Sequence, residues 1–105
     1  MNSVIRGTNA IIRYTIEDVD WSTVGSIEMY ITQCGKDLIK TREDLTVDTS
    51  TGEIMYKLTQ EESLALVPKR QLEVTVYLMI NGDRKEVRPI IRADVEPTRK
   101  NEVMV

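Results

Sequence analysis

The chain has 105 residues, of which 41% are hydrophobic and 30% are charged, and this balance is typical of one globular domain rather than of a disordered protein. Its net charge of −3 argues against a dedicated nucleic-acid binder, because such proteins usually gather a surplus of basic residues on one face. With four Tyr, one Trp and no Phe, the core must be built mainly from aliphatic side chains.

The residues available for catalysis or metal binding are few. The chain contains no His, which removes Ser–His–Asp and Cys–His catalysis and the commonest metal ligand. A structural zinc site needs several Cys or His residues, and Cys34 is the only cysteine. The five glycines are isolated from one another, so no glycine-rich phosphate loop is present. We therefore expect no enzymatic activity, no cofactor and no metal ion.

The same features bear on the compartment in which the protein is made. A single cysteine excludes an intrachain disulfide, which fits a reducing environment. The first residues, Met1 to Arg6, lack the long apolar region of a signal peptide, and no apolar run approaches the ~20 residues of a membrane helix. We expect a soluble protein made in the cytoplasm.

The first half of the chain shows the two-residue alternation of half-buried strands. Residues 9–17 alternate with an inward set of Ala10, Ile12, Tyr14 and Ile16. Residues 27–32 alternate again, with Ile27, Met29 and Ile31 inward. Turn-forming residues at 34–37 should fold 38–40 back as a short strand, and 45–47 is a further strand candidate.

The next segments predict a turn, a strand and one short helix. Residues 48–52 are rich in turn formers, and 53–58 then alternate, with Ile54, Tyr56 and Leu58 inward. Thr59 and Glu62 have the spacing of a capping box, in which each side chain bonds the backbone amide of the other residue. We expect a helix near residues 60–66, with Leu64 and Leu66 on its apolar side and Pro68 beyond its end.

The strongest local signal is the β-hairpin around Asn81-Gly82, since these two residues tolerate the positive φ angles of a tight turn. A loop of even length keeps Val87 and Ile91 on the inward face, whereas a three-residue loop would turn both outward. A two-residue loop predicts the pairs Leu78 with Lys85, Val76 with Val87, and Leu72 with Ile91.

Pro89 should interrupt this hairpin. The same counting places Pro89 opposite Val74 at a hydrogen-bonded position, where proline has no N–H to donate. We expect the ladder to break or bulge near Arg88-Pro89, and residues 90–95 to pair partly with a different strand.

Seven or eight short strands, regularly spaced turns and one short helix predict an all-β fold, an antiparallel Ig-like β-sandwich. The immunoglobulin disulfide cannot form with one cysteine, and a small barrel is an alternative. We place a single domain at residues 1–96 and expect residues 97–105 to form a mobile C-terminal tail.

Three polar features could carry chemistry, and each has a simpler interpretation. Glu17-Asp18-x-Asp20 could offer oxygens to Ca²⁺, but no glycine follows at the spacing of a calcium loop, and the stretch is equally typical of a polar turn. Glu61 and Glu62 are adjacent and belong to the start of the helix rather than to a glycosidase-like acid pair. Cys34 lacks a neighbouring His or basic cluster, although Lys36 is near.

Apolar side chains on predicted outward faces indicate protein contacts. These candidates are Ile11, Tyr30, Met55, Tyr77, Met79 and Ile90. Tyr and Met are favoured at interfaces, although scattered exposed apolar residues are also normal in monomers. We expect at least one cluster of them to serve self-association or partner docking. In the alternative, a carbohydrate- or surface-binding module, Trp21 beside Asp20 is the one aromatic side chain placed to contact a ligand.

The order of these segments resembles a known group of proteins. Ile5-Arg6-Gly7-Thr8 leads into Tyr14-Thr15-Ile16, Val19-Asp20-x-Ser22 precedes Ile27-x-Met29-Tyr30-Ile31-x-Gln33, and Thr59-Gln60-Glu61-Glu62-Ser63-Leu64 opens the helix. Over nearly the whole chain, this order is similar to small prophage tail-module proteins of Gram-positive bacteria. It also resembles the Ig-like N-terminal module of siphophage baseplate upper proteins, which anchors receptor-binding parts to the virion.

The resemblance implies a non-enzymatic structural or accessory protein of a phage tail or baseplate. Its partners would be tail or baseplate proteins, or further copies of itself, with no nucleic acid or membrane bound. It would reside in the host bacterial cytoplasm before assembly and in the virion afterwards. The family offers no catalytic residues to carry over. With one domain in this chain, we expect no second part of the kind that the baseplate module anchors.

Overall fold

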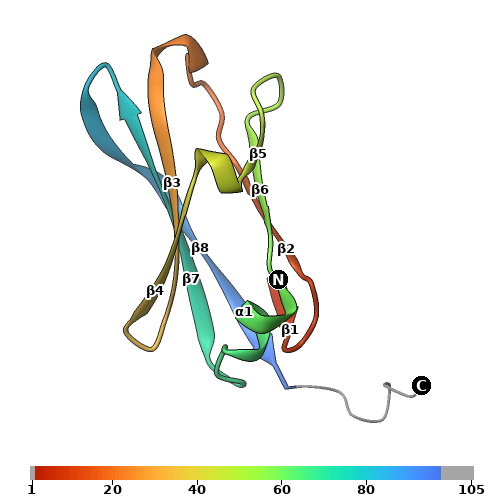
Figure 1. The fold of residues 1–105 in the computed structure, drawn as a ribbon. Coiled ribbons are helices and arrows are strands. Elements are labelled where there is room, and N and C mark those ends of the chain that lie inside the picture. Colours follow the sequence, from red (N-terminus) through yellow and green to blue (C-terminus); the bar gives the residue numbers. More distant parts are fainter. Residues whose placement is uncertain (1, 98–105) are drawn as a thin grey trace.

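The computed structural model describes residues 2–97 and is mostly β (Figure 1). Over this range it contains eight strands, one short α-helix and two 3₁₀ turns. The strands are β1 (Asn2–Ile5), β2 (Ile11–Thr15), β3 (Val24–Gln33), β4 (Lys36–Thr41), β5 (Thr46–Asp48), β6 (Glu53–Lys57), β7 (Gln71–Ile80) and β8 (Asp83–Glu96). The helix α1 is Gln60–Leu64, and the 3₁₀ turns are η1 (Trp21–Thr23) and η2 (Arg42–Asp44). The predicted tail lies outside the described residues from Thr98 onward.

The strands form two sheets rather than one closed barrel. The larger sheet has the order β1-β8-β7-β3-β4 and the smaller one the order β2-β6-β5, and Figure 1 shows them as two layers. The expectation of purely antiparallel sheets is wrong, because β1 runs parallel to β8. No short turn joins β1 to β8, so nothing forces the antiparallel direction that hairpin connections impose on their strands.

The alternating residues form the core between the two sheets. The predicted inward residues within β2, β3 and β6 are buried, including Tyr14 at 1% exposure and Met29 at 0%, whereas Ala10, just before β2, is only partly buried. The large sheet adds Leu72, Val74, Val76 and Leu78 from β7. Because one cluster contains buried residues from both sheets, the hydrophobic burial that stabilises each sheet depends on the presence of the other.

The Asn81-Gly82 turn has the expected geometry, with φ of 50° and 86°. Leu78 pairs with Lys85 and Val76 with Val87, as predicted.

The expected break at Pro89 is confirmed, since the register shifts between Val74 and Val76. The predicted pair of Leu72 with Ile91 is wrong: Val74 pairs with Ile91 and Leu72 with Ala93. The irregularity adds two residues to β8, and an even shift keeps Ile91 on the predicted inward side. From Ala93 onward β8 also pairs with β1, as expected for a second partner strand.

Helix α1 begins with the predicted capping box. The Thr59 hydroxyl accepts from the Glu62 amide at 3.1 Å, and the Glu62 carboxylate accepts from the Thr59 amide at 3.0 Å. The helix ends at Leu64, earlier than predicted, and the next turn is tighter: the Leu66 amide bonds the Ser63 carbonyl, three residues back. Leu64 is 42% exposed, contrary to expectation, and the buried residue of the helix is Ser63. A single turn is too short to present an apolar stripe.

Candidate functional site

The outer face of the large sheet carries two tyrosines and an arginine in contact, which we call the Tyr–Arg cluster: Tyr30 on β3, Tyr77 on β7 and Arg84 on β8. The tyrosine rings meet edge to face, with centroids 5.1 Å apart and an interplanar angle of 73°. The Arg84 guanidinium carbon lies 3.8 Å from the centroid of the Tyr77 ring and 5.7 Å from that of Tyr30. Both tyrosines were predicted to point outward, and the structure brings them together.

Polar contacts hold the cluster in one arrangement. Arg84 Nε lies 3.3 Å from a carboxylate oxygen of Glu28, and Arg84 Nη2 donates to the Tyr30 hydroxyl at 3.2 Å. The Tyr77 hydroxyl donates to Glu86 at 3.3 Å. Exposed ion pairs of this kind contribute only about 0–1 kcal/mol to stability. Their main consequence is that the side chains are positioned before any partner arrives.

Ile39 extends this surface and was missed by sequence reasoning. It lies on β4 directly opposite Tyr30 and is 47% exposed. The sequence did contain a signal, a two-residue turn at Cys34-Gly35, and both residues have positive φ in the structure. Such a turn pairs Gln33 with Lys36, and counting along the strands then pairs Tyr30 with Ile39. The Met79 side chain, half-buried and opposite Arg84, borders the cluster on its other side.

The remaining predicted contact residues lie elsewhere. Ile11, 49% exposed on β2, and Met55, half-buried on β6, lie on the outer face of the small sheet. Arg13 lies opposite Met55, with its Nη1 3.1 Å from the Met55 sulfur. Ile90 is half-buried in β8, at the irregularity that follows Pro89. The six residues therefore do not form one surface.

Trp21 is less available than the carbohydrate-binding alternative requires. It opens η1, is half-buried and packs against the core. Asp20 caps this turn, accepting from the amide and hydroxyl of Ser22 at 3.1 and 2.6 Å. These hydrogen bonds, that of the Ser22 hydroxyl first, lower the pKa of Asp20. The Asp20 carboxylate thus serves the turn, as in the simpler interpretation of this acidic stretch.

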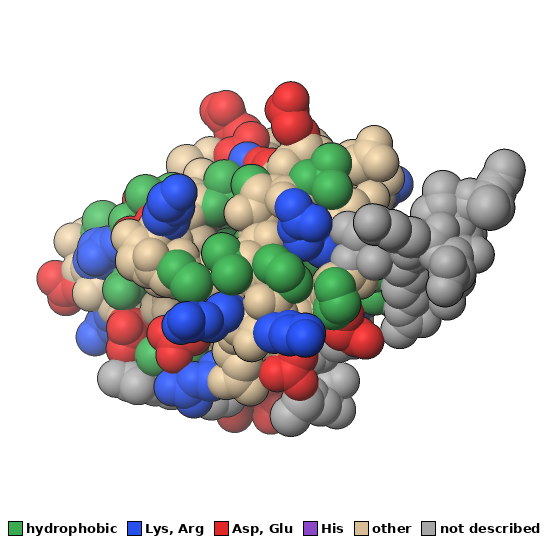
Figure 2. Space-filling view, turned by 90° about the horizontal axis from the view of Figure 1, so that it is seen from below, with side chains coloured by type: hydrophobic (Ala, Val, Ile, Leu, Met, Phe, Trp, Pro, Cys, Tyr) green, Lys and Arg blue, Asp and Glu red, His purple; other side chains and the backbone are tan. Residues whose placement is uncertain are grey.

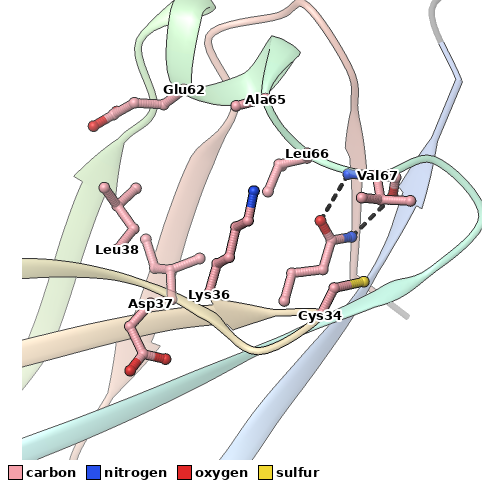
Figure 3. A pocket seen from close by; sticks show the side chains of 10 residues that line it. Cys34, Lys36, Asp37, Leu38, Glu62, Ala65, Leu66 and Val67 are labelled. Carbon is pink, nitrogen blue, oxygen red and sulfur yellow. Dashed lines mark hydrogen bonds between the residues drawn. The ribbon is translucent and has the colours of Figure 1, made fainter.

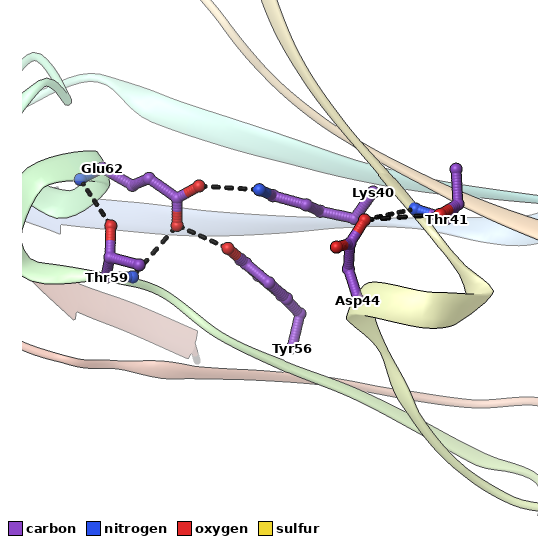
Figure 4. Close-up of polar contacts among 6 residues, drawn as sticks. All are labelled: Lys40, Thr41, Asp44, Tyr56, Thr59 and Glu62. Carbon is purple, nitrogen blue, oxygen red and sulfur yellow. Dashed lines mark hydrogen bonds and ion pairs between the residues drawn. The ribbon is translucent and has the colours of Figure 1, made fainter.

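A second set of polar contacts, which we call the Lys40–Glu62 latch, joins the two sheets (Figure 4). Lys40 on β4 and Glu62 on α1 form an ion pair of 2.8 Å, and each side chain is only 18% exposed. The Tyr56 hydroxyl on β6 donates to the same carboxylate at 2.6 Å, and Lys40 Nζ lies 4.9 Å from the centroid of the Tyr56 ring. One carboxylate therefore connects the large sheet, the helix and the small sheet.

The latch shifts the titration of all its members. Burial alone would raise the pKa of the Glu62 carboxyl, but three hydrogen bonds, the first of them from Lys40, outweigh burial and lower its pKa to about 2. The hydrogen bond to Glu62 raises the pKa of Lys40. Burial, together with the hydrogen bond to Glu62, raises the pKa of Tyr56. All three groups hold their ordinary charge at neutral pH, which is typical of a structural contact rather than of an acid–base catalyst.

The other polar candidates have structural positions. Cys34 is exposed in the tight turn between β3 and β4. Glu61 is exposed in the first turn of α1. Within residues 2–97 no three or more Cys, Asp and Glu side chains are grouped so as to hold a metal ion. Over the same range, no helix is long and apolar enough to cross a membrane.

Neither of two comparisons with known proteins indicates a class for this protein. No protein-family model matches the chain, and a search of curated proteins returned no match.

Proposed function

We propose that this protein is a non-enzymatic structural or accessory component of a phage or prophage tail or baseplate, acting through protein–protein contacts. The observation that carries the contact role is the Tyr–Arg cluster. Tyr and Arg are enriched among the few interface residues that dominate binding energy. Here Tyr30 and Tyr77 are half-buried, Arg84 is exposed, and all three are already positioned. Rigid aromatic side chains lose little conformational freedom when a partner binds, so such a surface favours association.

The strand order supports an Ig-like module. In variable-type Ig domains, strands B, E and D share one sheet, and strands G, F, C and C′ share the other. The sheets β2-β6-β5 and β8-β7-β3-β4 follow the same order, with α1 at the corner between E and F and β1 added beside β8. The Tyr–Arg cluster then lies on the outer face of the G-F-C-C′ sheet.

The assignment to a phage tail rests on the resemblance in segment order to tail-module and baseplate upper proteins. In that setting the protein is made in the host bacterial cytoplasm and then enters the virion. Its partner is a tail or baseplate protein or a further copy of the same chain. The single domain contributes a docking surface rather than a reaction.

Size-exclusion chromatography with light scattering tests this proposal. The chain is run alone and with each protein encoded by the neighbouring tail genes. We expect either a defined oligomer or a complex with a tail protein, and we expect Tyr77→Ala to weaken it. Lys57→Ala, at an exposed position on the outer face of the small sheet, is the matched control and should leave it intact. A strict monomer that binds none of these proteins would contradict the proposal.

A further inference from the structure

A groove lies at one end of the molecule, between β4 and the segment that joins α1 to β7 (Figure 3). Its volume is about 230 Å³, and its walls are mainly apolar, formed by Ile31, Leu38, Ala65, Leu66 and Val67. Figure 2 looks onto this end and shows hydrophobic side chains with Lys and Arg among them. We call this feature the β4–α1 groove. It is separate from the Tyr–Arg cluster, since Leu38 and Ile31 face inward whereas Tyr30 and Ile39 face outward.

The walls of the groove are fixed by buried polar contacts. The Gln33 side chain, 7% exposed, accepts from the Val67 amide at 2.7 Å and donates to the carbonyls of Val67 and Arg70 at 2.9 and 3.1 Å. The Lys40–Glu62 latch holds the helix on the other side. The groove is therefore formed in advance of any ligand, and binding there does not require the walls to be ordered first.

Among the charged residues that line the groove in the described part of the chain, one cation remains available. Glu62 is neutralised by Lys40. Asp37 accepts from Thr32 on the outer face, and its carboxylate points away from the groove in Figure 3. Lys36 instead extends between Leu38 and Leu66, and within residues 2–97 no carboxylate lies within ion-pair distance of its ammonium group. An apolar groove with one available ammonium group is complementary to an apolar group that carries an anion beside it.

The backbone of β4 adds a second kind of contact. In the described part of the chain β4 pairs with β3 alone, so its other side presents backbone N–H and C=O groups to an added strand. Lys36 and Leu38 are two residues apart on the same face, and an incoming strand has the same two-residue period. A carboxylate opposite Lys36 therefore places the side chain two positions away over the groove, beside Leu38.

The volume of the groove selects between ligand classes. Sites for cofactors and drug-sized molecules usually span about 300–1,000 Å³. The smaller volume here suits one or two side chains.

We propose that the β4–α1 groove and the free edge of β4 together bind an extended segment of a partner protein. In that segment an Asp or Glu, which pairs with Lys36, lies two positions from a bulky aliphatic residue, which fills the groove. This site does not depend on the Tyr–Arg cluster being a docking surface.

The test is an NMR titration of the full ¹⁵N-labelled chain with a synthetic peptide, acetyl-Thr-Asp-Thr-Leu-Thr-Thr-amide. We expect the amide signals of β4 and of residues 65–67 to shift. A peptide with Lys in place of Asp should bind about tenfold more weakly, since a charge-assisted hydrogen bond is lost. A peptide with Asp exchanged with the following Thr should also bind more weakly, because the carboxylate then faces away from Lys36.

The charge-reversed variant Lys36→Glu gives the decisive comparison. We expect it to prefer the Lys peptide over the Asp peptide, while the control Lys57→Glu keeps the preference of the unmodified protein. Equal binding of the Asp and Lys peptides, or shifts confined to other parts of the chain, would overturn the proposal. Concentration-dependent shifts of the same signals without peptide would also overturn it, since they would identify a second copy of this chain as the occupant.

Discussion

Lys40 and Glu62 form a 2.8 Å ion pair that joins β4, an edge strand of the large sheet, to helix α1, which follows β6, the central strand of the small sheet. Within residues 2–97 no strand of one sheet pairs with a strand of the other at this side, where β4 and β5 are the edge strands. The latch therefore supplies a polar connection where backbone hydrogen bonds do not. Glu62 also borders the β4–α1 groove, so loss of the latch has a structural and a functional readout.

Removing the charge of Glu62 should destabilise the protein. In Glu62→Gln the ion pair is lost and Lys40 keeps only a neutral partner in a largely buried position, which typically costs about 1–3 kcal/mol. Urea unfolding followed by circular dichroism measures this change. Glu61→Gln, one residue earlier and exposed, is the matched control and should stay within about 0.5 kcal/mol of the unmodified protein. Equal stability of the two variants would contradict the role of the latch.

The latch also predicts how stability depends on pH in acid. The pKa of Glu62 is lowered to about 2 in the folded chain, below the ordinary value of 4.5. A carboxyl with a lowered folded-state pKa contributes stability that is fully present above its unfolded pKa and is lost as pH falls through the folded one. We therefore expect unfolding free energies to fall between about pH 5 and pH 2, with about 1–2 kcal/mol of that fall absent in Glu62→Gln. Parallel pH profiles for the two proteins would contradict this assignment.

Two glycines with nearly the same backbone conformation should respond differently to substitution. Gly35 and Gly52 have φ of 78° and 79°, which costs any L-residue about 1 kcal/mol. A Cβ at Gly35 would meet open space, whereas one at Gly52 would collide with the carbonyl oxygen of Ile16. We expect Gly35→Ala to cost about 1 kcal/mol and Gly52→Ala about 1–3 kcal/mol more, because the backbone must move. Thermal unfolding measures both, and equal losses would show that the collision is relieved without cost.

Much of the fold could be predicted from local patterns. Strict alternation identified the inward faces of β2, β3 and β6, and both bonds of the predicted Thr59–Glu62 capping box are present. The two-residue turn at Asn81-Gly82 fixed the pairing of β7 and β8 as far as Val87. In each case the determining interactions involve residues close together in the sequence.

The features that were missed depend on distant parts of the chain. The four residues of β1 are too few to show a pattern, and they pair in parallel with residues 93–96. The size of the irregularity after Pro89 depends on how β8 resumes its pairing with β7. The contacts of Arg84 with Tyr30 and of Lys40 with Glu62 require the final sheet register and the relative position of the two sheets.

The central claim is that the Tyr–Arg cluster is the docking surface of this protein. The most direct measurement is the affinity of the unmodified chain and of Tyr77→Ala for the tail protein that co-elutes with it, determined by isothermal titration calorimetry. Because central aromatic residues of an interface often contribute at least 2 kcal/mol, we predict a loss of affinity of about thirtyfold, with Lys57→Ala unchanged. A Tyr77→Ala variant that is folded and binds as tightly as the unmodified chain would contradict the claim.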